Sequence, residues 1–207
     1  MSQHTYPVLP LYNLVMFPHL ITAIQTNDPY VQGLLGETSR SNGEFITSLM
    51  LEDGEYFHQV GCLVRLEEIE QTDNGMVQIT IRGLRKFFIE NCPTTQPIVY
   101  AEGHYLQDYY ESRNQAENSA LKLSKLVKRY IFLTNSQPEA MLQAVAFITD
   151  PAILSNFCAH YFMENAPHKQ DILQSLNIGK RVDEMIQFMS DQVQDKIAEQ
   201  SQGIHVF

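Results

Sequence analysis

Few stretches of this sequence place reactive side chains at a spacing that supports catalysis. Gly179-Lys180 lacks the earlier glycine of a phosphate-binding loop, and no Ser or Thr follows the lysine to hold magnesium. Ser124 and Lys125 are adjacent, and adjacent residues on a helix face apart, so they form no nucleophile–base pair. No Gly-x-Ser-x-Gly nucleophile motif occurs. We therefore expect no catalytic residues and a protein that is not an enzyme.

Metal ligands are equally sparse. Cys158 and His160 are two residues apart on an expected helix, so their side chains diverge by about 200°. His58 follows Asp53 and Glu55 in an expected turn and could chelate weakly, but solvated polar residues in a hairpin loop are the simpler interpretation. The sequence therefore predicts neither a metal site nor a cofactor.

Composition indicates a globular protein rather than a disordered chain. The 207 residues are 44% hydrophobic and 18% charged. The net charge of −10 disfavours nucleic acid as a partner. Cysteines are scattered, with no Cys-x-x-Cys pair, which favours free thiols in a reducing compartment: Cys62, Cys92 and Cys158.

The segment "LPLYNLVMFPHL", residues 9–20, raises the question of a targeting segment. No basic residue precedes it, and Pro10, Asn13, Pro18 and His19 interrupt its apolar run, so it does not read as a signal peptide. No later stretch reaches the roughly 20 apolar residues of a membrane span. We expect a cytoplasmic protein without a membrane partner.

The first half of the chain reads as β-structure. Residues 6–11 alternate, and Pro7 and Pro10 suggest an edge strand or a strand end. Residues 60–89 form the clearest hairpin pattern, because Asn74-Gly75 suits a type I′ turn between two alternating strands. Past Gly83 the alternation shifts at Leu84, which predicts a bulge or a barrel corner.

The second half reads as helical. Ser112 and Asp150 are expected helix caps, the latter followed by Pro151 at the first helical position. After Ser112, an apolar stripe runs along the expected helix from Ala116 to Ile131, and lysines and an arginine lie outside this stripe. The fold class is therefore α+β, with a β-rich segment over residues 1–110 and a helical segment over 111–207 that ends in a long helix.

Basic and aromatic residues gather next to the predicted bulge. Arg82, Arg85 and Lys86 precede Phe87 and Phe88, a combination that on a small β-barrel could bind RNA. The acidic net charge favours the other interpretation, a solvated strand end beside core phenylalanines.

Taken together, the motifs resemble the amino-terminal substrate-binding domain of Lon proteases. Residues 8–20 are similar to that family's first strand and Phe-Pro-His turn. Residues 60–89 are similar to its hairpin, which ends in Gly-Leu-Arg. "DPAILSNFCAHYF" and "KQDILQSLNIGKRVDEMIQFM" are similar to its helical motifs. The resemblance runs in order over about residues 5 to 195.

The resemblance implies a PUA-like β-barrel followed by an all-helical bundle. It also implies recognition of polypeptide, either unfolded segments or degradation tags, or docking on a protease or another protein as an adaptor or regulator. The family's ATPase and Ser-Lys protease would follow Phe207, so neither activity is transferred. We expect a complete small protein, with a fragment of a longer Lon protease and an RNA-binding module as the alternatives, and an oligomer as an open expectation.

Candidate contacts for a polypeptide lie in the turn and near the bulge. They are Met16, Phe17, Pro18, His19, Leu84 and Phe88. Physically they would provide an apolar groove beside an open sheet edge, where an added strand can pair. Core packing of the same residues is the competing interpretation. Arg82 stands where the family often carries an acidic residue, so the chain departs from the family at this surface.

Overall fold

The chain forms two compact units. The computed structural model describes residues 3–38, 42–51, 57–73, 75–94 and 97–203. The first unit contains the chain up to Gln107 together with Met163–Gln174, and the second contains Asp108–Phe162 and the chain from Ser175 onward. The expected division into two consecutive segments differs from these units, because one helix of the C-terminal half belongs to the first.

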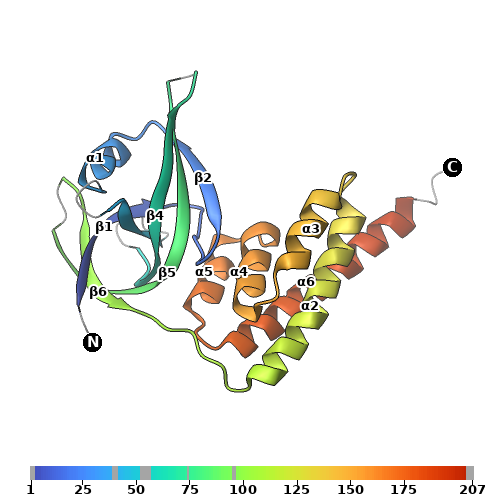
Figure 1. Cartoon of the computed structure of the whole chain (residues 1–207). Coiled ribbons are helices and arrows are strands. Elements are labelled where there is room, and N and C mark those ends of the chain that lie inside the picture. Colours follow the sequence, from blue (N-terminus) through green and yellow to red (C-terminus); the bar gives the residue numbers. More distant parts are fainter. Residues whose placement is uncertain (1–2, 39–41, 52–56, 74, 95–96, 204–207) are drawn as a thin grey trace. The chain divides into compact units, whose positions relative to one another are not determined.

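The first unit is built on a six-stranded mixed sheet in the order β2-β5-β4-β3-β1-β6 (Figure 1). Its strands are β1 (His4–Leu11), β2 (Ile21–Thr26), β3 (Glu44–Leu49), β4 (Val60–Gln71), β5 (Val77–Thr94) and β6 (Tyr100–Tyr105). A further pairing of β5 with β6 closes five strands into a ring, with β2 attached outside it. The ring is barrel-like rather than a fully closed barrel, and it confirms the expected α+β, PUA-like class.

The expectation that residues 6–11 form an edge strand is wrong. β1 lies between β3 and β6, but each half of it pairs on one side only. His4–Pro7 pairs with β6, and Val8–Leu11 pairs with β3 in parallel. Both prolines are tolerated in an interior strand because each half of β1 pairs with one neighbouring strand only. On the unpaired side, a missing backbone N–H removes no hydrogen bond between strands.

The predicted hairpin and bulge are both present. β4 and β5 pair from Gln71↔Val77 back to Val60↔Phe88, and Gly75 at the turn has a φ of 78°. Asn74, the other expected turn residue, and the expected turn at Asp53-Gly54 lie outside the described residues. The register shifts between Leu63 and Val64, which leaves Leu84 as the extra residue of a bulge.

The bulge changes which face of the sheet β5 supplies. Two hydrophobic clusters use alternate residues of the same strands, as Phe45 and Ile46 of β3 show. Ile81 belongs to the first cluster and Phe87 to the second, although they are six positions apart and would share a face in a regular strand. The extra residue at the bulge accounts for this switch of face.

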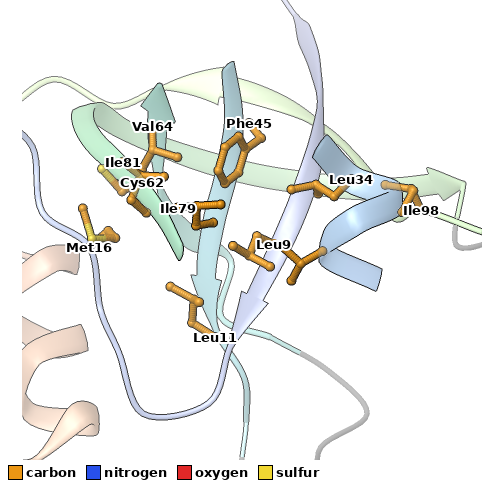
Figure 2. Packing of buried hydrophobic residues seen from close by; sticks show 11 residues of the cluster. Leu9, Leu11, Met16, Leu34, Phe45, Cys62, Val64, Ile79, Ile81 and Ile98 are labelled. Carbon is orange, nitrogen blue, oxygen red and sulfur yellow. The ribbon is translucent and has the colours of Figure 1, made fainter. Parts of the chain in front are cut away.

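Helix α1 (Pro29–Thr38) covers the first cluster. Asp28 caps the helix: its carboxylate accepts from the Tyr30 N–H at 2.9 Å. Figure 2 shows Leu34 beside Ile98 and, further along the cluster, side chains of β1, β3, β4 and β5 that converge in one core. This core positions the strand edges described below.

Five helices follow the sheet in the sequence. They are α2 (Arg113–Thr134), α3 (Glu139–Phe147), α4 (Pro151–Phe162), α5 (Ala166–Gln174) and α6 (Ile178–Gly203). The predicted caps are confirmed, since Ser112 accepts from the Gln115 N–H and Asp150 accepts from the Ala152 N–H. α5 belongs to the first unit, where buried Gln170 donates to the Val60 carbonyl at 2.7 Å.

The second unit consists of α2, α3, α4 and α6. The predicted apolar stripe of α2 is buried, and α2 packs chiefly against the long final helix α6. Among the described residues, no helix combines the length and apolar composition that crossing a membrane requires.

Candidate functional site

The Phe17-Pro18-His19 turn is anchored to β5 by its backbone. The His19 N–H donates to the Gly83 carbonyl and the Gly83 N–H donates to the Leu20 carbonyl, both at 2.8 Å. A Cβ on Gly83 would overlap the carbonyl oxygen of Phe17, so only glycine allows this approach. The two sequence motifs, the turn and the Gly-Leu-Arg segment, are therefore halves of one structural feature.

Most of the expected apolar contact residues lie in the core. Met16 and Phe17 are 1% and 0% exposed, and Pro18 is also buried. They fill the space behind the turn, so in this conformation they offer no surface to a client. His19 is exposed, with a φ of 70°, while Leu84 and Phe88 are half-buried near the bulge.

The expected basic patch is not a single surface. Lys86 is 2% exposed, because the bulge at Leu84 turns this part of β5 inward. Arg82 is exposed and pairs with Glu67 at 2.7 Å. Arg85 stacks over the Tyr105 ring, 4.6 Å from its centroid. The three cations therefore have different surroundings: Lys86 is buried and the charge of Arg82 is neutralised by Glu67.

A groove of about 370 Å³ lies between β1 and β2 in the first unit. Its walls come from residues 9–12 on one side and residues 24–26 on the other, and its floor includes Ile79 and Val31. Tyr12 at the rim is 70% exposed, whereas the floor belongs to the core cluster. The groove is therefore an apolar slot between two strand edges.

β2 presents an open edge to this groove. Its described pairing is with β5 alone, and it ends the strand order. In an antiparallel pair, every second residue of a strand directs its N–H and C=O toward the partner strand. Because the Leu20 carbonyl accepts from the Gly83 N–H of β5, Thr22 and Ile24 also direct their backbone groups toward β5. Ile21, Ala23 and Gln25 then direct theirs outward, where an additional strand could pair.

The β1 side of the groove offers fewer donors. Pro10 carries no N–H. The Val8 N–H donates to the Val99 carbonyl at 2.9 Å, and the Val8 carbonyl accepts from the Tyr30 hydroxyl at 2.7 Å. The Tyr30 hydroxyl also accepts from the Val99 N–H at 3.1 Å, and burial raises the pKa of Tyr30, so it remains a neutral cap at the groove end. A guest strand would pair on β2.

The residues that line the groove are mainly apolar, with Gln25, Thr26 and Asp28 as polar members. Among the described residues, no three His, Cys, Asp or Glu side chains converge as ligands for a metal. Burial raises the pKa of the Cys62 thiol to about 12 and also raises that of Cys158, so neither thiol provides a thiolate nucleophile.

Sequence reasoning missed the groove residues for a definable reason. The place of β2 at the end of the strand order depends on pairings with distant residues. Residue types gave no signal, because apolar and polar residues do not alternate along Ile21–Thr26, and the alternation of exposed and half-buried positions appears only in the structure.

Comparison with known proteins gives a consistent result. The family described as the ATP-dependent protease La (LON) substrate-binding domain matches residues 5–191. The Lon protease of Brevibacillus choshinensis is 20% identical over 192 residues, covering 90% of this chain and 25% of that protein. The Lon protease of Xanthomonas oryzae pv. oryzae is 22% identical over 195 residues, covering 90% of this chain and 23% of that protein. The chain thus spans about a quarter of the length of these relatives.

Two solved structures share the fold. The N-terminal domain of a Mycobacterium avium complex Lon protease has a TM-score of 0.78 at 17% identity, covering 91% of this chain and 99% of that one. A Lon N-terminal domain protein from Xanthomonas campestris has a TM-score of 0.64 at 16% identity, covering 90% of this chain and 99% of that one. With the family match over residues 5–191, the chain belongs to the Lon substrate-binding domain family.

Proposed function

We propose that this chain is a non-catalytic binding protein for extended polypeptide, either unfolded segments or degradation tags. Membership of the substrate-binding domain family supports the binding role. The observation that carries the polypeptide assignment is the apolar groove along the open edge of β2. An extended segment supplies both the backbone groups that pair with such an edge and the alternate side chains that fill an apolar slot.

The binding mode follows from the geometry of a strand. Outward backbone groups at Ile21, Ala23 and Gln25 would pair with the guest. Alternate guest side chains would point toward the floor at Ile79 and Val31. Main-chain pairing tolerates many sequences, whereas the floor selects aliphatic side chains. Such a site suits clients that share extended conformation and apolar character rather than one sequence.

The direct test uses a fluorescein-labelled peptide of alternating Val and Ser residues, with a second peptide in which prolines replace the serines as the matched control. The proline peptide cannot form the ladder and should bind at least tenfold more weakly in fluorescence anisotropy. Ala23→Pro removes one outward N–H of β2 while keeping the bonds to β5, and should weaken the first peptide similarly.

Tyr12→Ala separates the groove from general surface effects. Tyr12 lines the groove and is 70% exposed, so its loss should weaken peptide binding with little change in stability. Tyr109→Ala is the matched control, because Tyr109 is 49% exposed in the second unit. Equal affinity of both peptides for the unmodified chain, or full affinity after Ala23→Pro, would contradict the proposed site.

Proteolytic context sets the cellular role that we propose. A chain that binds polypeptide without an active site would act as an adaptor or regulator that hands clients to a protease, or docks on one. Free Cys62, Cys92 and Cys158 agree with a cytoplasmic location. Charge gives the RNA-binding alternative little support, because Arg82 is paired and Lys86 is buried.

A further inference from the structure

One face of α2 combines cations with exposed apolar side chains. At about 100° per residue, the solvent side of the helix gathers six residues within a stripe about 120° wide: Leu121, Lys122, Lys125, Lys128, Arg129 and Phe132. Leu121 and Phe132 are 64% and 71% exposed. The buried stripe of α2 lies on the opposite side, so these residues are not part of the core. We call this set the basic face.

The basic face is electrostatically uncompensated within the described structure. None of its four cations forms an ion pair with a carboxylate among the residues that the structure describes. Four of the chain's 14 basic residues thus stand within eight positions of one helix, in a protein of net charge −10. A cationic surface with large exposed apolar residues in an acidic chain indicates a binding surface for an acidic partner.

The first unit carries a complementary surface on the β4–β5 hairpin. The end of β4 and the turn that follows it carry four carboxylates: Glu67, which pairs with Arg82, and Glu68, Glu70 and Asp73. Ile69 is 49% exposed but points to the opposite face from Glu68 and Glu70, because its cross-strand partner is Ile79. Residues 66–81 contain no basic side chain. We call this set the acidic hairpin.

We propose that the basic face of one chain docks on the acidic hairpin of a second copy of the same chain. The lengths agree: Leu121 to Phe132 spans about 16 Å along a helix, and Glu67 to Asp73 spans about 20 Å along a strand. Glu68 and Glu70 lie on the same face of the hairpin, because their partners Thr80 and Gln78 alternate with the core residue Ile79, so both carboxylates can meet cations of the basic face.

The proposed contact joins two different surfaces, so it is heterologous. Each docked copy leaves one basic face and one acidic hairpin free, and association continues until a ring closes or a chain grows. The contact uses residues other than those that line the groove between β1 and β2. Because the ion pairs are solvent-accessible, association weakens as salt is added.

The test is a reciprocal charge reversal in the full chain, read by sedimentation velocity over a concentration series. Lys125→Glu with Arg129→Glu makes the basic face acidic. Glu68→Lys with Glu70→Lys makes the hairpin basic. Each double variant alone should raise the dissociation constant for self-association at least about tenfold, since like charges then oppose each other.

Mixing the two double variants supplies the decisive arm. The reversed face of one variant then meets the reversed hairpin of the other, and the unmodified surfaces also match, so the mixture should associate again. Restored association also demonstrates that both variants are folded. Lys180→Glu, a single charge reversal outside both surfaces, should leave self-association unchanged.

Several outcomes would overturn the proposal. These are an unmodified chain that stays monomeric at every concentration, a mixture that does not recover, and a Lys180→Glu variant as defective as the reversed ones. RNA binding, measured with a labelled oligonucleotide and lost on reversal of Lys125 and Arg129 in a monomeric chain, would assign the face to nucleic acid instead.

Discussion

Different interactions stabilise the interior of each unit. In the first, backbone meets backbone: a Cβ on Gly83 would overlap the Phe17 carbonyl, and one on Gly103 would overlap the Phe88 carbonyl. In the second, the fully buried side chain of Arg181 joins distant parts of the chain. At these two glycines the backbones of neighbouring segments are in direct contact, so no side chain fits between them. Helices pack with their axes 8–10 Å apart, which leaves room for a long side chain between them.

Arg181 illustrates the second mode. Its Nη1 lies 2.8 Å from Asp108 Oδ2 and also donates to the Ser175 carbonyl at 3.0 Å. Its Nε donates to the Ser155 hydroxyl at 3.3 Å. One guanidinium therefore ties α4 and α6 to the segment that leads into α2. We therefore expect one added methyl group to lower the stability of the first unit, and one lost charge to lower the stability of the second.

Gly83→Ala should have the largest effect. The added Cβ would displace the Phe17 turn, and we expect the free energy of unfolding of the first unit to fall by more than about 4 kcal/mol. The measurement is thiol labelling in a Cys92→Ser background, because Cys62 is buried in the first unit and Cys158 in the second. Faster labelling of Cys62 than of Cys158 is the expected pattern, and unchanged protection of Cys62 would contradict it.

Arg181→Ala should come next and should affect the second unit. It leaves the half-buried Asp108 carboxylate without its guanidinium, and we expect a loss of about 3 kcal/mol. Urea denaturation followed through Cys158 labelling measures the change. Arg181→Met is the informative control, because it keeps the bulk of the side chain, so an equal loss would indicate that the charge rather than the packing matters.

Asp150→Ala tests a local signal in the second unit. The Asp150 carboxylate accepts from the N–H groups of Ala152 and Ile153 at 2.8 and 3.1 Å. Its removal should cost about 1 kcal/mol, and Asp150→Asn, which keeps the acceptor oxygen, should cost much less. Thermal unfolding by circular dichroism separates the two variants, and equal melting temperatures would argue against a capping role.

Gly36→Ala should have the smallest effect, and it tests a glycine of the first unit that makes no close backbone contact. Nothing lies within 4 Å of a Cβ placed at Gly36, which stands in the exposed part of helix α1. Alanine there should raise the free energy of unfolding by about 0.5 to 1 kcal/mol. A loss of stability instead would mean that glycines of the first unit matter beyond direct backbone contact.

Local signals carried the sequence predictions that the structure confirms. Caps at Ser112 and Asp150 depend only on nearby N–H groups, and the bulge beside Gly83 follows from a break in alternation. Predictions that needed knowledge of neighbours fared worse. Pro10 suggested an edge strand, although one-sided pairing allows it inside the sheet.

The candidate site shows the same limit. Phe17 and Lys86 have the residue types of a binding surface, but the turn and the bulge bury both. Tyr12 and Ile24 are residue types found throughout proteins, and their part in the groove depends on which strands pair with β2. Residue type thus predicted what could bind, and strand order decided what is accessible.

By itself, the sequence determined the α+β class, the family resemblance, the helix caps and the hairpin, because each depends on periodicity or on contacts a few residues apart. Only the tertiary structure decided that β2 keeps an open edge, that α5 joins the β-rich unit, and that Arg181 is the buried centre of the second unit. These depend on contacts between residues far apart in the chain, where burial and pairing are properties of the whole fold rather than of any local segment.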